Sequence, residues 1–155
     1  MGSSSRYTRR EQPTFLQYLH YRPQEGIDRM PPGVPATRIT ELSQSLGLPR
    51  RTLLAFLGIS RASVNRRVQA CLPLPVDESQ RVLGIESLVK QIQTMVEESG
   101  HDEAPGFDAA HWLGYWIRQP MPALGGRLPA SYLHTLDGQP LVRKMLAMIA
   151  TGTYA

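Results

Sequence analysis

The stretch that decides the fold is PRRTLLAFLGISRASVNRRVQ, residues 49–69. Its first half carries three leucines at the spacing of one helix face: Leu53, Leu54 and Leu57. Pro49 suits the first turn of that helix, where a missing N–H costs nothing, and Gly58 is typical of a helix end. Ser60 is a candidate N-cap for a second helix that runs to about Ala70. The sequence therefore predicts two short helices joined by a tight turn.

Two such helices with a glycine in the turn form a helix-turn-helix motif. In DNA-binding proteins the second helix of this motif enters the major groove, and side chains near its N-terminus reach the edges of the bases. Val64 and Val68 are predicted to point inward, which leaves the polar side chains of this helix largely exposed. An ordinary pair of amphipathic helices with a solvated basic face would give a similar pattern, so the residues alone leave that alternative open.

Four side chains of the second helix are predicted to read bases: Arg61, Ser63, Asn65 and Arg66. Arginine can fork onto O6 and N7 of guanine, and asparagine can pair with adenine. Four others are predicted to hold phosphates, which fixes the register without reading sequence: Arg50, Arg51, Thr52 and Arg67. Two positions depart from the usual motif, because Leu54 stands where a small residue is typical and Arg67 where an apolar one is. Double-stranded operator DNA is the partner that these residues predict.

The distribution of charge along the chain supports a polyanionic partner for this segment. Residues 38–76 contain six basic residues and one acid, a net charge of +5. Residues 77–155 contain six basic residues and nine acids, a net charge of −3, and residues 1–37 carry +2. A basic block beside an acidic block indicates two surfaces with different partners.

The flanking segments also have helical periodicity. A helix is expected from the N-cap candidate Thr37 to Gly47, with one apolar face: Ile39, Leu42 and Leu46. Asp77 and Gln80 have the spacing of a capping box. The helix that they open is expected to end at Gly100 and carries a long apolar stripe: Ile85, Leu88, Val89, Ile92, Met95 and Val96.

The C-terminal third predicts three shorter helices. Asp108 is the expected N-cap of the first, which ends before Pro120 and has one apolar side: Ala109, Trp112, Leu113, Trp116 and Ile117. An ordered loop should follow over 120–128, and Pro129 should start a short helix to Leu133. The last helix is expected to open at Pro140 and to bury five side chains: Leu141, Val142, Met145, Leu146 and Ile149. No stretch alternates apolar and polar residues, so the predicted fold class is all-α.

Three regions follow from these patterns. Residues 1–36 are rich in proline and predict a tail or strap, in which 15–19 could form one short helix. Residues 37–76 form the predicted helix-turn-helix DNA-binding domain, and residues 77–155 a C-terminal helical domain. Residues 1–5 could be native or a remnant of expression, and they do not enter the prediction of the fold.

Several classes of protein are disfavoured. No apolar run approaches the roughly 20 residues of a membrane span, and no signal-peptide core follows the N-terminus, so we expect a cytoplasmic protein without membrane contact. Cys71 is the single cysteine, which excludes an internal disulfide. The four histidines are scattered: His20, His101, His111 and His134. Gly125-Gly126 lacks the lysine and the helix context of a phosphate loop. We therefore expect no enzyme activity, no metal and no cofactor.

The stretch WIRQPMPALGGRLP, residues 116–129, is followed by a spaced set of residues: Leu133, Thr135, Gly138, Val142, Leu146, Ile149, Gly152 and Tyr154. This pattern resembles the toxin-binding domain of the Xre/MbcA/ParS antitoxins, whose signature is a Trp-Leu, a Pro-x-Pro-Ala-Leu-Gly-Gly-x-x-Pro loop and a Gly-aromatic ending. The resemblance covers about residues 40–155. One departure is Ile117, where the family usually has leucine.

The resemblance implies an antitoxin of a type II toxin–antitoxin system. It implies a partner with a RES domain, a toxin that depletes NAD, and repression of the antitoxin's own operon. Carried over by position, the toxin-binding residues are in the loop and the tail: Met121, Leu124, Gly125, Gly126, Arg127, Gly152 and Tyr154. A short terminus that carries an aromatic residue, here Tyr154, can enter a cleft at small entropic cost.

Two expectations complete the prediction. We expect a homodimer, because one recognition helix reads few bases, and the 85–96 helix is a candidate for part of the contact. The alternative function is a helix-turn-helix transcriptional regulator that senses a small molecule in its C-terminal domain. A cavity lined by Met95, Trp112 and Met145 would favour that alternative, whereas an exposed apolar surface would favour a protein partner.

Overall fold

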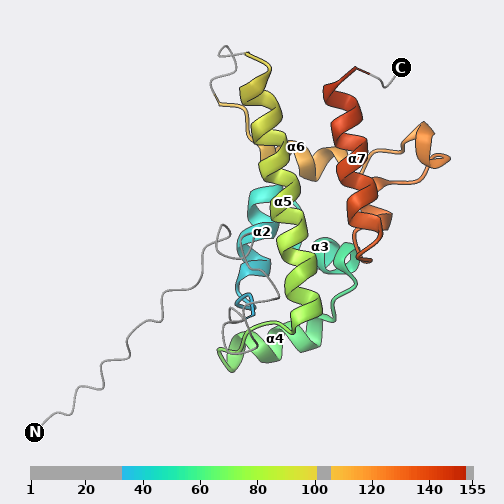
Figure 1. Ribbon diagram of the computed structural model, residues 1–155. Coiled ribbons are helices and arrows are strands. Elements are labelled where there is room, and N and C mark those ends of the chain that lie inside the picture. The colour runs from blue at the N-terminus through green and yellow to red at the C-terminus, as the bar shows by residue number, and fades with distance from the viewer. Residues whose placement is uncertain (1–32, 101–105, 153–155) are drawn as a thin grey trace, which may run out of the picture. The chain divides into compact units, whose positions relative to one another are not determined.

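The computed structural model describes residues 33–100 and 106–152, and Figure 1 shows how their helices are arranged around one long helix. That helix is α5 (Val76–Glu98), against which α3 (Arg50–Leu57), α6 (Ala109–Trp116) and α7 (Gly138–Ala150) pack. The described residues contain helices and two isolated β-bridges but no strand, which confirms the all-α fold class. The predictions for residues 1–32 and for Tyr154 lie outside the described residues.

The helix-turn-helix segment folds as its local sequence predicts. Helix α2 (Arg38–Leu46) precedes α3, and α4 (Arg61–Gln69) follows it. Gly47 and Gly58 end α2 and α3 with φ of +68° and +64°, left-handed values that favour glycine because it has no Cβ. The leucines predicted for the inner face of α3 are buried. Pro49 takes the N-cap position of α3, one residue before the predicted first turn.

The start of α5 differs from the prediction. The helix begins at Val76, directly after Pro75, so the predicted capping box of Asp77 and Gln80 does not form. Asp77 lies in the first turn, and its carboxylate accepts a hydrogen bond from Nη2 of Arg81 at 3.1 Å. A negative charge there is favourable because the first turn carries the positive end of the helix dipole. Thr37 similarly takes the N-cap position of α2 without a hydrogen bond from its side chain.

The C-terminal elements confirm most of the predicted order. Asp108 caps α6, since its Oδ1 accepts from the backbone N–H of His111 at 3.0 Å. Two short 3-10 turns follow, η3 (Pro122–Leu124) and η4 (Pro129–Tyr132), before α7. Helix α7 begins at Gly138, two residues before the predicted start at Pro140. Leu141 was predicted to be buried and is 38% exposed, because it lies on the face of α7 turned away from the core.

One hydrophobic core runs through the whole described region. Its fully buried side chains come from both halves of the chain, among them Ile39, Leu53, Leu57, Ile85, Leu88, Leu113, Leu133 and Leu146. Val82, Ile85, Leu88 and Ile92 form the buried stripe of α5, so this helix contributes to the core on its N-terminal and C-terminal halves alike. None of the described helices is long and apolar enough to cross a membrane.

Gly114 allows α6 to approach α2 closely. A Cβ atom at position 114 would lie 1.9 Å from the carbonyl oxygen of Leu46, at the C-terminal end of α2. Real Cβ atoms do not approach backbone atoms so closely, so any larger residue requires the two helices to separate. This contact joins the last residues of α2 to a helix about 65 residues further along the chain.

We expect Gly114→Ala to lower the free energy of unfolding by about 1–3 kcal/mol, because overpacking costs more than the roughly 1 kcal/mol by which alanine favours a helix. The measurement is the urea midpoint of the purified variant. The neighbouring Tyr115→Ala removes a larger side chain that is 58% exposed, and it should change stability by less than about 0.5 kcal/mol. A Gly114→Ala variant as stable as the wild type would contradict the close approach.

Candidate functional site

The first candidate surface is formed by α4 and the start of α3. Arg61, Asn65 and Arg66 are exposed on α4, whereas Val64 is fully buried and fixes the helix against the core. Ser60 caps α4 as predicted, because its Oγ accepts from the backbone N–H of Ser63 at 3.4 Å. The predicted base-reading side chains therefore share one short helix. We call these side chains, together with Arg50, Arg51, Thr52 and Arg67, the basic face.

One hydrogen bond joins α3 to α4 across the basic face. Nη1 of Arg50, the first residue of α3, donates to Oδ1 of Asn65 at 2.8 Å. The next residue, Arg51, is exposed, and Thr52 is half-buried. Two residues that the sequence assigned to different tasks, a phosphate contact and a base contact, are thus neighbours. A guanidinium that holds the amide oxygen also fixes the direction of the Asn65 amide group.

Arg67 has a structural contact that the sequence did not predict. Its Nη1 donates to the backbone carbonyl of Pro73 at 2.8 Å, which ties the end of α4 to the connection before α5. The polar side chain therefore has a partner at a position where the motif usually has an apolar residue. Val68, beside it, is half-buried and packs against the core in place of Arg67.

The second candidate surface is the loop Met121–Arg127, which follows α6 and precedes α7 in the chain. Figure 1 shows it projecting beside α7, on the side away from α6. The loop is closed by two backbone hydrogen bonds of 3.0 Å, from Met121 N–H to the carbonyl of Arg127 and from Gly126 N–H to the carbonyl of Met121. Gly125 and Gly126 have φ of +65° and +82°, and no atom lies within 4 Å of where a Cβ would be. The glycines are therefore required by the backbone turn rather than by crowding.

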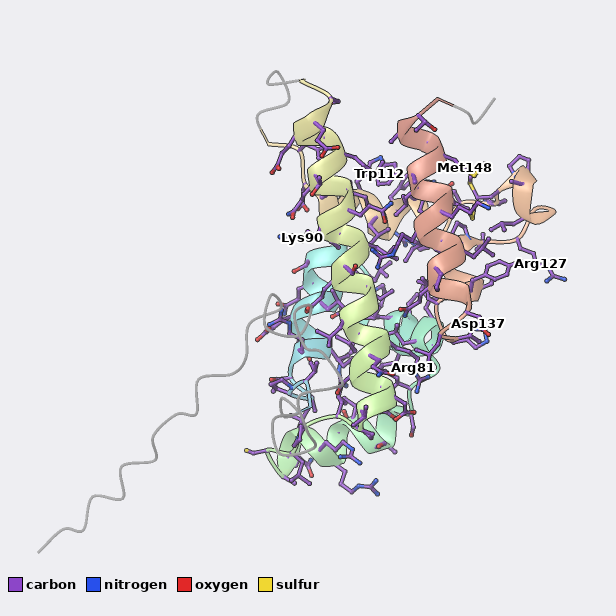
Figure 2. All side chains as sticks on the ribbon, viewed as in Figure 1. Arg81, Lys90, Trp112, Arg127, Asp137 and Met148 are labelled. Atoms are coloured by element: carbon purple, nitrogen blue, oxygen red, sulfur yellow. The ribbon has the colours of Figure 1, made fainter. Side chains whose placement is uncertain are left out.

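The predicted toxin-binding residues divide into two groups. Met121 and Leu124 are half-buried and pack against the core, so they anchor the loop. Gly125, Gly126 and Arg127 are exposed, and Figure 2 shows the Arg127 side chain directed away from the helices. Gly152, just after α7, is exposed with φ of +66°.

Aromatic residues near the loop belong mainly to the core. Trp112 and Trp116 of α6 stack with ring centroids 5.9 Å apart, and Trp116 is 7% exposed. Trp112, labelled in Figure 2, and Met95 are half-buried and pack against the core, and Met145 is buried within it. A cavity lined by these three side chains would favour a small-molecule sensor, and the structure shows each of them packed in or against the core.

One ion pair orders α2 against α5. Nε of Arg38 donates to Oε1 of Glu86 at 2.5 Å, and Glu86 is the more buried partner. This hydrogen bond raises the pKa of Arg38 and outweighs the opposing effect of burial. Within residues 33–100 and 106–152, no three histidine, cysteine or acidic side chains gather in a way that could hold a metal ion.

Sequence reasoning missed a polar connection that joins α7 and α5 to the turn of the helix-turn-helix motif. Arg81 of α5 donates to the carbonyls of Leu57 and Gly58, in the turn before α4, and Gln139 of α7 donates to the carbonyl of Arg81. The one signal in the sequence was Gly84. A glycine inside a long helix lowers the stability of the helix by about 1 kcal/mol relative to alanine, and it often marks a place where another element packs closely.

Comparisons with known proteins match both surfaces. Residues 27–86 match the model of the antitoxin Xre-like helix-turn-helix domain. Residues 107–152 match the model of the antitoxin Xre/MbcA/ParS C-terminal toxin-binding domain. A relative from Sphingobium sp. (strain YBL2), named Prs ADP-ribosylating antitoxin, is 39% identical over 145 residues, which cover 92% of this chain and 90% of the relative.

We expect Ser60→Ala to lower the free energy of unfolding by roughly 0.5–2 kcal/mol, because it leaves the first N–H groups of α4 without their cap. Thermal or urea unfolding followed by circular dichroism measures the change. Ser60→Asp is the matched control, since a carboxylate also accepts from these N–H groups and should retain the stability. An alanine variant as stable as the aspartate variant would show that the cap contributes nothing.

Proposed function

Because the chain belongs to the Xre/MbcA/ParS family of antitoxins, we propose that it neutralises a RES-domain toxin that consumes NAD and represses its own operon as a DNA-bound homodimer. The chain is an antitoxin with a helix-turn-helix domain, and its C-terminal domain binds a toxin. The observation that carries the proposal is the match of this domain over residues 107–152, which include the projecting loop.

The loop Met121–Arg127 suits a protein partner because it is ordered before it binds. Its two backbone hydrogen bonds and its apolar anchors, Met121 and Leu124, hold the tip in one conformation. A preordered loop loses little conformational entropy on association, so more of its contact energy contributes to affinity. Arg127 at its end offers a planar, permanently charged group, a type common among the residues that dominate protein interfaces. We assign this loop to the toxin contact.

We assign the NAD chemistry to the partner rather than to this chain. The Sphingobium relative carries ADP-ribosylation in its name. ADP-ribosyl transfer and hydrolysis of NAD both break the bond between nicotinamide and ribose, so a toxin of either kind consumes NAD. This shared step supports a RES-type, NAD-depleting partner. Whether the ADP-ribose is transferred to a protein or to water distinguishes the two kinds of toxin.

In cells that express the RES-domain protein encoded beside it, the wild-type chain should restore growth and NAD content. Arg127→Glu should abolish this protection and weaken the purified complex about tenfold or more, as expected when a charged anchor is reversed. Titration calorimetry and a cellular NAD assay are the measurements. Arg61→Glu, an equal charge reversal on the basic face, is the control and should protect fully.

Two results would count against these assignments. Full protection by Arg127→Glu with an unchanged complex would remove the loop from the toxin contact. A wild-type chain that forms no complex with the RES-domain protein would show that the partner is a different toxin.

The basic face supports DNA binding by its charge and by its placement. The segment of residues 38–76 has a net charge of +5, and its exposed arginines lie on and beside α4. We assign the exposed Arg61 and Arg66 to guanine contacts and the exposed Arg51, at the start of α3, to a phosphate contact. Because residues 27–86 match a helix-turn-helix model, we assign α4 as the recognition helix and α3 as its supporting helix.

A homodimer follows from the small size of the reading surface. One helix of nine residues contacts few base pairs, which cannot distinguish an operator from the rest of a genome. Two copies related by twofold symmetry read two half-sites about one helical turn apart, and the binding free energies of the two half-sites add. We therefore propose that the operator is an inverted repeat.

On the site selected from random DNA by the wild-type protein, Arg61→Ala and Arg66→Ala should each lose about 1–3 kcal/mol of binding free energy. The loss should be much smaller on unselected DNA, because a base contact is made only with the correct base. Arg51→Ala is the control. It should weaken binding to all DNA sequences evenly and reduce the slope of log K against log salt concentration by about one. An equal loss on selected and unselected DNA would make Arg61 and Arg66 phosphate contacts.

A further inference from the structure

Arg81 reaches from α5 into the turn of the helix-turn-helix motif. Its Nη1 donates to the carbonyl of Leu57 at 2.7 Å and to that of Gly58 at 3.3 Å. These carbonyls are at the C-terminal end of α3, where the helix leaves its last oxygens without helical partners. A charged donor there stabilises the end of α3 and fixes the direction in which the chain continues into α4. The Arg81 side chain is only 15% exposed.

Gln139 at the start of α7 holds the same part of α5. Its buried Nε2 donates to the carbonyl of Arg81 at 3.0 Å and to that of Leu133, after η4, at 3.1 Å. The other amide atom lies against Gly84, where a Cβ would be 1.7 Å from Oε1 of Gln139. The chain thus keeps an unfavourable glycine in the middle of α5 to admit one polar side chain from α7.

The turn between α3 and α4 therefore touches the C-terminal region directly. A Cβ at Gly58 would lie 3.3 Å from Nη1 of Arg81 and 3.3 Å from Cβ of His134, which precedes α7. Figure 2 shows Arg81 near the N-terminal end of α5, and it labels Asp137 at the start of α7. A chain of hydrogen bonds also joins α7 to this turn, from Gln139 to the carbonyl of Arg81 and from the Arg81 side chain to the carbonyl of Gly58.

We propose that Gln139 and Arg81 are positioning residues for α4, through which binding of a protein partner to the C-terminal region changes the affinity for DNA. This inference rests on the proposed function, because it needs both partners. A partner that shifts α7 moves Gln139, and with it the segment of α5 from which Arg81 holds the turn. Coupling between two binding sites is reciprocal, so DNA must change the affinity for the partner by the same factor.

The competing interpretation is that Gln139 only packs α7 onto α5. A double variant separates the two. Gly84→Ala alone should clash with Gln139, but Gly84→Ala with Gln139→Ala removes both the clash and the hydrogen bonds, and alanine favours both helices. Gln139→Met is a second variant, which keeps Gly84 and the side-chain volume but donates nothing. Each variant should melt within about 5 °C of the wild type.

Gln91→Ala is the matched control. Gln91 of α5 donates through Nε2 to the carbonyl of Arg143 in α7 at 3.0 Å, so it joins the same two helices by the same kind of bond. It has no contact with Arg81 or with the turn at Gly58 among the described hydrogen bonds. Removing it tests whether the loss of any hydrogen bond between α5 and α7 changes the coupling between the two binding sites.

The experiment measures the Kd for the selected operator with and without saturating RES-domain protein, by fluorescence anisotropy on the full chain. The wild-type ratio of the two values should differ from one by about 5- to 150-fold, the usual range of coupling. In the double variant and in Gln139→Met the ratio should fall to within about twofold of one, whereas Gln91→Ala should keep the wild-type ratio.

Three outcomes would overturn the inference while both binding activities remain: a wild-type ratio of one, an unchanged ratio in both Gln139 variants, or an equal loss in Gln91→Ala. A wild-type chain that binds no operator or no RES-domain protein would instead overturn the proposed function, and the inference with it.

Discussion

The structure depends on burial of the apolar stripe of α5. Val82, Ile85 and Leu88 are completely buried, and helices from both sides of the chain, α3 before it and α6 and α7 after it, supply the surfaces that cover them. Hydrophobic burial scales with area and has no direction, so it explains why these helices gather but not how each is oriented. A consequence is that the helix-turn-helix domain and the C-terminal toxin-binding domain are not two cores joined by a linker. They are two sides of one core.

Orientation comes from a few directional contacts at the edges of this core. The Oγ of Ser79 is buried, accepts from Val34 N–H and donates to the carbonyl of Leu74, which secures the segment before α2 against the start of α5. In the same way, Gln139 secures α7 against α5, and Arg81 secures the turn after α3 against α5. A buried polar group is costly without partners and specific with them, so each such contact excludes other arrangements of the helices. Gly114, where α6 meets α2, acts through shape instead of polarity.

This arrangement suits the two partners that we propose, a toxin and operator DNA. The basic face and the Met121–Arg127 loop share no residue, and Figure 1 shows α4 at the N-terminal end of α5, away from the loop and from the end of α7. The contacts around Gly58 join the two sides most directly by hydrogen bonds, and the packing of α6 on α2 and of α2 on α3 joins them as well. A rigid common core transmits an influence between the two sides better than a flexible linker, because a packed interior has discrete arrangements rather than continuous deformations.

The sequence by itself determined the helices and their ends, because these depend on residues close together in the chain. Gly47, Gly58, Ser60 and Asp108 end or begin helices as predicted, since a left-handed turn or a side-chain cap requires only local chemistry. The loop residues and the basic residues could also be named from sequence, and their roles remain predictions. Only the tertiary structure decided the start of α5 at Val76, the exposure of Leu141, and the contacts of Arg50, Arg67, Arg81 and Gln139. Each of these depends on which atoms from other elements lie nearby, and the spacing of residues along one helix does not contain that information.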